Sequence, residues 1–321
     1  MLYFIVNETS RSGKSTGIWQ QLQDALAARA INYKAWKTEY EGHALELARE
    51  ICQMQDDDIC LVVVGGDGTI NEVINGINVI NGSNGMSGFE RVRLGVIPTG
   101  SGNDFARGLK ILGTPVQNLE RILNCIEKGS NEAYVIDLGQ VSWEGCEKPR
   151  LFAISAGMGL DALVCKKALT SKIKKFLNKI HLGKLTYLIL TVQSLFSMET
   201  TEAAVHFDGK GQTNLNKVIF LAAMNFRAEG GGVPMVPDAV ATDGKLSVCT
   251  VWGIPKWRTF FCLPFLVAAK HLWIRGFDVT NCVEFAAKTK SPMVLHADGE
   301  YLGDVTDVKF TCLPGKLRML E

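Results

Sequence analysis

The 321-residue chain lacks paired cysteines: its nine cysteines are scattered, and none forms the C-x-x-C pattern of zinc and redox sites. Most of them stand in apolar runs, where cysteine acts as a small hydrophobic residue, and this is typical of reduced thiols in a cytoplasmic protein. The five histidines also lack metal-ligand spacing. The pattern therefore excludes a zinc site built from cysteine and histidine, and we expect a cytoplasmic location.

Long apolar runs are absent as well. Residues 1–6 are apolar, but this run is too short for a signal peptide and has no basic region. The most apolar later stretch, residues 259–274, contains Pro264, Lys270 and His271, and it is shorter than the roughly 20 residues that cross a bilayer. We therefore expect residues 2–6 to form a strand and no segment to be transmembrane.

Neither sign of charge is in excess, because 34 basic and 33 acidic residues give a net charge of +1. No global field attracts nucleic acid, which we do not expect as a partner. The length of the chain and its hydrophobic content of 47% are sufficient for two packed domains.

Apolar strands alternate with helices up to about residue 132. This alternation is typical of an α/β domain with a mostly parallel, doubly wound sheet. We predict strands at 2–6, 59–64 and 94–98, and helices at 18–30, 71–80 and 104–112.

Beyond that point short strands follow one another, many of them without a helix between. Such a succession is typical of a mainly antiparallel β-sandwich, here interrupted by a helical insertion at 162–198. The strands are predicted at 135–143, 151–155, 203–207, 218–224, 246–252, 283–287, 294–297 and 308–312.

Two glycine-rich loops share one design, in which an apolar strand ends in glycines and a helix follows. The first is Gly65-Gly66-Asp67-Gly68-Thr69, and the second is 99–104, Thr-Gly-Ser-Gly-Asn-Asp. Glycines allow the backbone to approach a phosphate, and a helix N-terminus presents free N–H groups to it. Thr69 and Glu72 have the spacing of a capping box, which predicts that the first helix begins there.

Both loops contain an acidic residue, Asp67 in one and Asp104 in the other. In a parallel sheet the loops leave the carboxyl ends of their strands, where ligands bind. Because a carboxylate beside a polyphosphate is repulsive without a cation, the two acids imply magnesium. The alternative is that the loops are tight turns in which these acids only cap helices.

A third loop, residues 7–15, follows the first strand and imitates a P-loop. The early glycine of that motif would fall at Glu8, so a true P-loop is not expected. We expect Gly13 and Lys14 to close over the phosphates, and the alternative is a solvated turn.

The motifs GGDGTINE at 65–72 and PTGSGNDFAR at 98–107 resemble the diacylglycerol kinase catalytic-domain family, in its bacterial lipid-kinase branch. The resemblance implies a nucleotide-binding domain at 1–132, a β-sandwich lipid-substrate domain at 133–308, an active site in the cleft between them, and a tail at 309–321 that returns to the first domain. Further segments are similar, so the resemblance runs through nearly the whole chain. They are 7–14, 136–139, 155–161, 243–244 and 296–300.

The resemblance also implies roles for single residues. Asp67, Asp104 and Asp137 match acids of a water-and-magnesium network. A second, structural magnesium site is matched by Asp243 and by the backbone of Val240 and Lys245, since the Lys245 ammonium would repel a cation. Where the family usually has proline, this chain has Glu8. Contacts to the nucleotide fall on Asn7, Ser12, Gly13, Lys14, Thr38, Gly65, Gly66, Asp67, Gly68, Thr69, Asn71, Glu72, Ser101, Gly102 and Asn103.

The turn Asp298-Gly299-Glu300 is the candidate catalytic segment. The resemblance implies that Glu300 is the proton acceptor, and we take Asp298 as the second catalytic candidate. Phosphoryl transfer needs positioning, charge neutralisation and an acceptor for the hydroxyl proton, which a carboxylate can supply. From the residues alone this segment, like Asp137 and the 243–244 turn, is typical of ordinary strands and hairpins.

The function that these motifs favour is phosphoryl transfer from ATP, with magnesium, to a hydroxyl of diacylglycerol or a similar membrane lipid. NAD kinases and phosphofructokinases share GGDGT, so that motif alone does not select a lipid. A sphingoid base and phosphatidylglycerol stay open as acceptors, as does a nucleotide-binding regulator without catalysis. The oligomeric state is open too, a homodimer included.

The insertion at 162–198 has seven lysines and no acidic residue. A basic amphipathic helix can lie on an anionic membrane, so we expect transient contact with the inner membrane surface. The alternative is that the apolar side packs on its own domain. As a helix, the insertion would have Leu169, Ile173, Phe176, Leu177 and Ile180 on one side and Lys172, Lys174, Lys175 and Lys179 on the other.

Overall fold

The computed structural model describes residues 1–9, 15–54, 58–78, 87–129, 134–170 and 183–320. The chain forms two compact units. The first consists of residues 1–136 and 315–321, and the second of residues 137–314. Each unit is described separately below.

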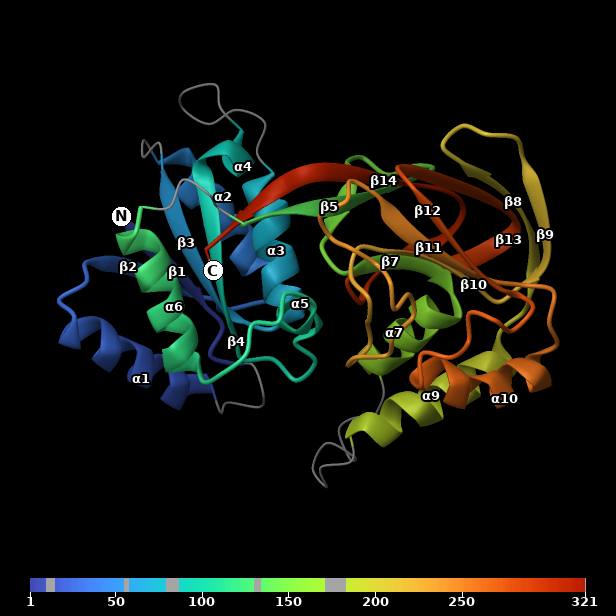
Figure 1. Cartoon of the computed structure of the whole chain (residues 1–321), viewed down its shortest axis with the longest axis horizontal. Helices are drawn as coiled ribbons and strands as arrows, with labels where there is room; N and C mark the ends of the chain where they lie inside the picture. Colours follow the sequence, from blue (N-terminus) through green and yellow to red (C-terminus); the bar gives the residue numbers. More distant parts are fainter. Residues whose placement is uncertain (10–14, 55–57, 79–86, 130–133, 171–182, 321) are drawn as a thin grey trace. The chain divides into compact units, whose positions relative to one another are not determined.

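The first unit is built on a parallel sheet in the order β4-β3-β1-β2, with the end of β14 parallel to β4 (Figure 1). The strands are β1 (Leu2–Val6), β2 (Tyr33–Lys37), β3 (Ile59–Gly65), β4 (Val92–Pro98) and β14 (Glu300–Met319). The helices are α1 (Ser15–Ala28), α2 (His43–Gln53), α3 (Asp67–Ile77), α4 (Gly88–Arg91), α5 (Asp104–Gly108) and α6 (Pro115–Glu127).

Helices cover both faces of this sheet, and the alternation of side chains along β1 explains how. Every residue of β1 is buried. Leu2, Phe4 and Val6 pack in a cluster with α1 and α6, and the residues between them point to the opposite face, where α2 and α3 lie (Figure 1). The predicted doubly wound α/β fold is confirmed.

Strand β1 lies between β2 and β3, so the chain order reverses at the β1–β3 pair. Ligands of open α/β sheets bind at the carboxyl ends of strands beside such a reversal. The loops after β1 and β3 therefore lie where ligands bind in sheets of this kind. The prediction omitted β2, α2 and α6, because β2 is short and half-exposed and the two helices are amphipathic with polar mean composition.

The predicted capping box at Thr69 is wrong. Helix α3 begins at Asp67, two residues earlier, and its N-cap Gly66 makes no side-chain hydrogen bond. The Glu72 carboxylate instead accepts hydrogen bonds from the Gly42 and Ala44 backbone N–H groups, at 3.0 and 3.1 Å. It therefore caps the N-terminus of α2, a contact between distant segments that no local spacing predicts.

The second unit is a mainly antiparallel β-sandwich, as predicted. Its principal sheet runs β12-β11-β10-β7-β13-β14; β5 pairs with β14 and β6 with β5, while β8 pairs with β13 and β9 with β8. The strands are β5 (Tyr134–Trp143), β6 (Arg150–Phe152), β7 (Ser155–Gly159), β8 (Thr201–Phe207), β9 (Thr213–Val218), β10 (Phe220–Met224), β11 (Leu246–Val251), β12 (Phe277–Cys282) and β13 (Glu284–Ala297).

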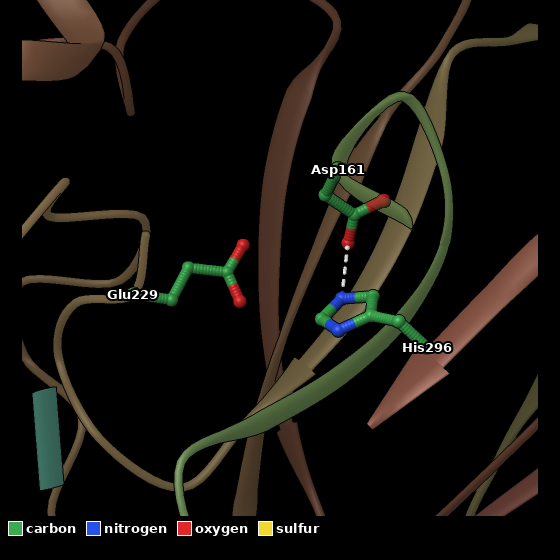
Figure 2. A group of neighbouring side chains, drawn as sticks. All are labelled: Asp161, Glu229 and His296. Carbon is green, nitrogen blue, oxygen red and sulfur yellow. Dashed lines mark hydrogen bonds and ion pairs between the residues drawn. The ribbon is translucent and has the colours of Figure 1, made fainter. Parts of the chain in front are cut away.

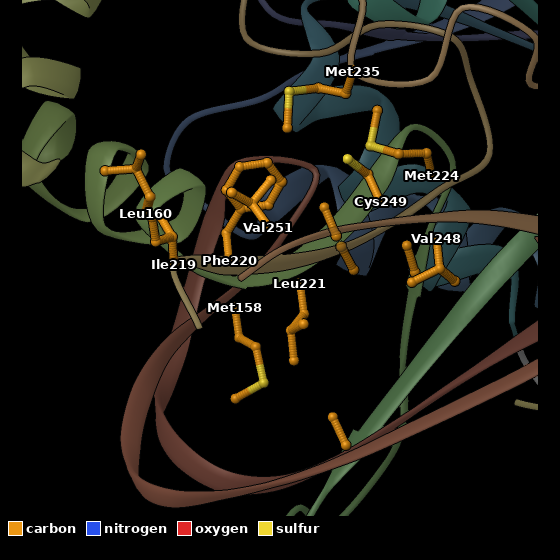
Figure 3. Close-up of a cluster of buried hydrophobic side chains, with 14 of the residues drawn as sticks. Met158, Leu160, Ile219, Phe220, Leu221, Met224, Met235, Val248, Cys249 and Val251 are labelled. Atoms are coloured by element: carbon orange, nitrogen blue, oxygen red, sulfur yellow. The ribbon is translucent and has the colours of Figure 1, made fainter. Parts of the chain in front are cut away.

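The core of this unit gathers around the middle strands β7, β10 and β11. Met158, Leu221 and Val248 are fully buried there (Figure 3). Strand β13 joins the predicted strands 283–287 and 294–297 into one, with a register shift between Lys288 and Met293. A tight turn at 298–299 then leads directly into β14, so the catalytic candidate lies on a hairpin.

The helical insertion contains α7 (Leu160–Thr170) and α9 (Gly183–Ser197), and α10 (Lys256–Val267) packs beside α9. Residues 171–182, which carry most of the predicted amphipathic pattern, lie outside the described residues. No helix in the described part of the chain has both the length and the apolar character needed to cross a membrane.

All nine cysteines are free thiols. Burial raises the pKa of Cys52 to about 11, against the opposing charge of Arg91. Burial likewise raises the pKa of Cys282 and of Cys312 to about 12. These thiols are protonated near neutral pH and serve as packing residues.

Candidate active site

The two glycine-rich loops of the first unit lie backbone against backbone. The Thr99 N–H donates to the Gly65 carbonyl at 2.8 Å. A Cβ on Gly100 would come within 2.7 Å of the Gly66 Cα, and a Cβ on Gly66 within 3.1 Å of the Gly100 Cα. Only glycine fits at both positions. The two loops therefore pack together and form one continuous backbone surface at the ends of β3 and β4.

Asp67 fastens the first loop to the second. Its carboxylate accepts hydrogen bonds from the backbone N–H groups of Asp104 and Phe105, both at 3.1 Å. These are the first two residues of α5, so Asp67 supplies the negative charge that a helix N-terminus favours. Asn103, just before the helix, has a φ of +53°.

Asp104 forms an ion pair with Arg107, one turn further along α5. The Arg107 guanidinium also donates to the Gly102 carbonyl at 2.9 Å. This arginine therefore links two residues of the second loop, Gly102 and Asp104. The i, i+3 spacing of Asp104 and Arg107 was available in the sequence, but the arginine was not singled out there.

The residues present fit a hard divalent cation. A Cβ on Gly102 would lie 3.0 Å from Asp67 Oδ2 and 3.6 Å from Asp104 Oδ2. Glycine thus leaves a space open beside two carboxylate oxygens. Carboxylate oxygens are the protein ligands that magnesium prefers.

The loops after β1 and β2 reach the same edge of the sheet. Asn7 donates through Nδ2 to Thr69 Oγ1 at 2.9 Å, so it spans the point at which the chain order reverses. The Thr38 N–H donates to the Val6 carbonyl at 2.9 Å. Glu8 pairs with Lys37 on β2 at 3.0 Å.

The residues predicted to contact the nucleotide differ in their burial and in their hydrogen-bond partners. Ser101 and Gly68 are exposed, whereas Asn71 is buried and joined to Asn75 at 3.1 Å. Glu72 is held by α2, as described above. Ser12, Gly13 and Lys14 lie outside the described residues. All of these assignments stay predictions.

In the second unit Glu300 pairs with Arg150, whose guanidinium lies 2.5 Å from Glu300 Oε2. The two side chains are 30% and 21% exposed, so the pair is accessible to a substrate yet partly shielded from water. The contact with Arg150 orients the Glu300 carboxylate, a group that can accept a proton. Because 150 positions separate the two residues, no local pattern pointed to Arg150.

Asp298 is engaged by the backbone of a neighbouring segment. Its carboxylate accepts hydrogen bonds from the N–H groups of Ala153, Ile154 and Ser155, at 2.8, 2.8 and 3.0 Å. The residue itself has a φ of +47°. Asp298 therefore anchors the turn that carries Glu300, which favours a positioning role for this carboxylate.

Replacing Asp298 by alanine should lower the free energy of unfolding by about 2–4 kcal/mol, because three backbone N–H groups in a largely buried segment lose a charged acceptor. Urea denaturation of the variant measures the loss. Asp304→Ala is the control: it removes a half-exposed partner of Lys166 and should change stability by at most about 1 kcal/mol. Equal stability of the two variants would contradict the anchoring role.

His296 lies beside Asp161 and Glu229, the group of three ligand-type side chains that the described residues bring together (Figure 2). Its Nε2 is 3.1 Å from Asp161 Oδ2, and the Gly299 N–H donates to its Nδ1 at 3.2 Å. With both ring nitrogens engaged, the imidazole has no lone pair available for a metal. Within the group a hydrogen bond joins His296 to Asp161, and His296 also holds the turn that carries the catalytic candidate Glu300.

Two opposing influences act on His296. Burial disfavours its charged form, but the hydrogen bond and charge of Asp161, with Glu229 and Asp298, raise its pKa above the ordinary value. A second ring proton would sit on Nδ1 and displace the Gly299 N–H. The neutral ring, with its proton on Nε2, is therefore the form that supports the turn as it stands.

The loop of the predicted structural magnesium site, residues 240–245, contacts Asp137, which the resemblance assigns instead to the water-and-magnesium network of Asp67 and Asp104. Asp137 accepts from the Gly244 N–H through Oδ2 at 2.7 Å, and its own N–H donates to the Ala241 carbonyl at 2.8 Å. Asp243 accepts from the Lys245 N–H at 3.0 Å within its own turn. Val240 is 44% exposed just before it. The oxygens of this loop fit a hard cation, and the assignment stays a prediction.

Comparison with known proteins supplies the family. The model of the diacylglycerol kinase catalytic domain matches residues 1–138, and that of the YegS C-terminal NAD kinase beta sandwich-like domain matches residues 154–321. A "Diacylglycerol kinase" of Staphylococcus carnosus is 30% identical over 84% of this chain and 79% of its own length. This chain belongs to the diacylglycerol kinase family. It is a lipid kinase of that type, as the motifs predicted.

Other relatives extend the likeness over the whole of this lipid kinase. "Putative lipid kinase YtlR" of Bacillus subtilis is 25% identical over 99% of this chain and 98% of its own. The solved structure of a "putative diacylglycerol kinase" from Bacillus anthracis matches with a TM-score of 0.73 over 99% of this chain and 96% of that chain. At 21% identity, that structure supports the fold alone.

Proposed function

We propose that this lipid kinase transfers the γ-phosphoryl group of ATP, with magnesium, to a hydroxyl of diacylglycerol or a related lipid, and that Glu300 accepts the hydroxyl proton. The observation that carries the proposal is the backbone surface of the two packed glycine-rich loops, with Asp67 and Asp104 beside it. Backbone N–H groups and glycines suit a polyphosphate, and the two carboxylates suit its cation. Relatives named diacylglycerol kinase support the choice of acceptor.

In the proposed reaction the Glu300 carboxylate takes the proton of the lipid hydroxyl. The hydroxyl oxygen forms a bond to the γ-phosphorus, and the bond from that phosphorus to the β–γ bridging oxygen breaks, so that ADP leaves. Arg150 orients Glu300 before the transfer. Magnesium would neutralise phosphate charge beside Asp67 and Asp104.

The proposal divides the work between the two units. The glycine-rich loops belong to residues 1–136, and the proposed proton acceptor belongs to residues 137–314. We propose that the first unit is the nucleotide-binding domain predicted at 1–132 and that the second is the lipid-substrate domain predicted at 133–308. The predicted tail, residues 309–321, contains the part of β14 that pairs with β4. We also propose that the enzyme is cytoplasmic and meets its substrate at the membrane.

Phosphorylation of a panel of acceptors in mixed micelles, with labelled ATP, tests the function. We expect product with diacylglycerol, dependence on magnesium, and little ATP turnover without lipid. The panel includes sphingosine, phosphatidylglycerol and NAD. NAD is needed because the matched model of the second unit is described as NAD kinase-like.

Each outcome has a distinct meaning. Turnover with NAD alone would overturn the choice of a lipid acceptor. Preference for sphingosine or phosphatidylglycerol would keep the mechanism and change the substrate. ATP binding without transfer to any acceptor would indicate a nucleotide-binding regulator.

A further inference from the structure

An exposed apolar surface lies on helices α9 and α10, which pack side by side (Figure 1). The rings of Phe196 on α9 and Phe260 on α10 are 6.1 Å apart. Nine of the eighteen large apolar side chains that are exposed in the described part of the chain belong to these helices and to the turn after α10. We call these nine the apolar face: Leu188, Ile189, Phe196, Trp257, Phe261, Phe265, Val267, Leu272 and Trp273.

Helix α10 is apolar on both of its sides. One side contributes Thr259, Cys262 and Leu266 to the core. The side chains at i, i+4 and i+8 on the other side are large and aromatic, although a helix that packs on its own domain normally has a polar outer side. Core packing therefore does not explain this second set. Its members are Trp257, Phe261 and Phe265, which are 61%, 64% and 44% exposed.

The turn after α10 presents an indole on a fixed support. Trp273 is 78% exposed, yet its Nε1–H donates to the Lys270 carbonyl. His271 beside it is fully buried, donates through Nε2 to the Met235 carbonyl at 2.9 Å, and packs on Phe277. Burial lowers the pKa of His271, so the ring stays neutral there. An outward tryptophan on an anchored turn is suited to contact something outside the molecule.

Positive charge lies beside the apolar face. The segments that carry it, residues 188–198 and 256–277, contain four lysines and arginines and no acidic residue, in a chain whose net charge is only +1. Arg258, Lys270 and Arg275 are exposed next to the aromatic side chains. A surface that is aromatic and cationic at once matches an anionic bilayer, where tryptophan favours the interface and each nearby lysine adds attraction.

We propose that the apolar face docks this enzyme on a lipid bilayer that contains anionic lipid, with Trp257, Phe261 and Trp273 entering the interface. The proposal rests on the proposed function in one respect: a lipid kinase has a reason to bind a bilayer. Its test is independent of that function, because it measures binding without turnover. The residues that contact the membrane here are not those of the amphipathic segment predicted from the sequence. The strongest contacts are assigned to aromatic side chains of α10 and of the turn after α10.

Sedimentation of the full chain with vesicles, in the absence of ATP, tests the proposal. The vesicles are phosphatidylcholine with or without phosphatidylglycerol. Trp257→Ser with Phe261→Ser should weaken binding to the anionic vesicles at least about tenfold, because two large apolar groups lose their insertion. The control, Leu112→Ser with Val279→Ser, removes exposed apolar side chains elsewhere and should bind like wild type.

The single variant Trp273→Ser, in the turn outside any helix, repeats the test should the double variant fold poorly. Unchanged turnover on a short-chain, dispersed lipid would show that the variants keep their chemistry. Wild-type vesicle binding by both aromatic variants would overturn the proposal. So would loss of a wild-type dimer in the variants with vesicle binding unchanged, since the face would then contact a second copy of the chain.

Discussion

Replacing Glu300 by glutamine is expected to lower kcat about 10²–10⁴-fold and to leave ATP affinity nearly unchanged. The amide retains the shape and one hydrogen-bond acceptor for Arg150, which lies 2.5 Å from the carboxylate. It cannot take a proton from the lipid hydroxyl. ATP affinity should survive because the glycine loops belong to the other unit.

Steady-state kinetics and ATP titration of the same preparation measure both quantities. Asp307→Asn is a matched control, because Asp307 is another acidic residue of β14 and pairs with Lys288 at the surface, 3.7 Å away. Its turnover should equal that of wild type. Normal turnover of Glu300→Gln would remove Glu300 from the mechanism and direct attention to Asp298. A matching loss of thermal stability would instead indicate a structural role for the Arg150 pair.

The sequence predicted those parts of the molecule whose causes are local. A strand was predicted at 2–6 because these five consecutive residues are apolar, and all five are buried in β1. The glycine-rich loops were recognised because a backbone that closely approaches a phosphate needs glycines, and these stand close together in the sequence. The close approach of Gly66 to Gly100 was not predicted and is added by the structure.

Features that depend on pairing between distant segments were not predicted. Glu72 was interpreted as a cap of its own helix and in fact caps α2, about thirty positions earlier. Arg150 pairs with Glu300 across 150 positions. Three backbone N–H groups of residues 153–155 hold the carboxylate of Asp298, a contact that the sequence did not indicate. Local spacing carries no record of such partners, because the tertiary fold selects them.

The apolar face illustrates a different limit. Residues 259–274 were recognised as apolar, and the sequence gives no sign of which side of such a helix is covered. Only the fold separates Cys262, which is buried, from Phe261, which is 64% exposed. Periodicity predicts that a helix has a buried side and is silent on a second apolar side.

Asp67→Ala is expected to lower turnover about 10²-fold or more and to weaken the response to magnesium, since one of the two carboxylates beside Gly102 is lost. The structure adds a second effect. Asp67 accepts hydrogen bonds from two N–H groups at the start of α5, so the variant should also lose about 1–2 kcal/mol of unfolding free energy. Urea denaturation and magnesium titration of kcat measure the two effects separately.

Asp67→Asn separates the two roles of the carboxylate. The amide oxygen can still accept one of the α5 N–H groups, so stability should recover in part, but the group is neutral and turnover should stay as low as in the alanine variant. Asp58→Asn is the control in the same unit, because Asp58 is 59% exposed and pairs with Arg93. It should leave both quantities near wild type. If the asparagine variant regained turnover in proportion to stability, capping of α5 alone would explain Asp67, and the magnesium role would be wrong.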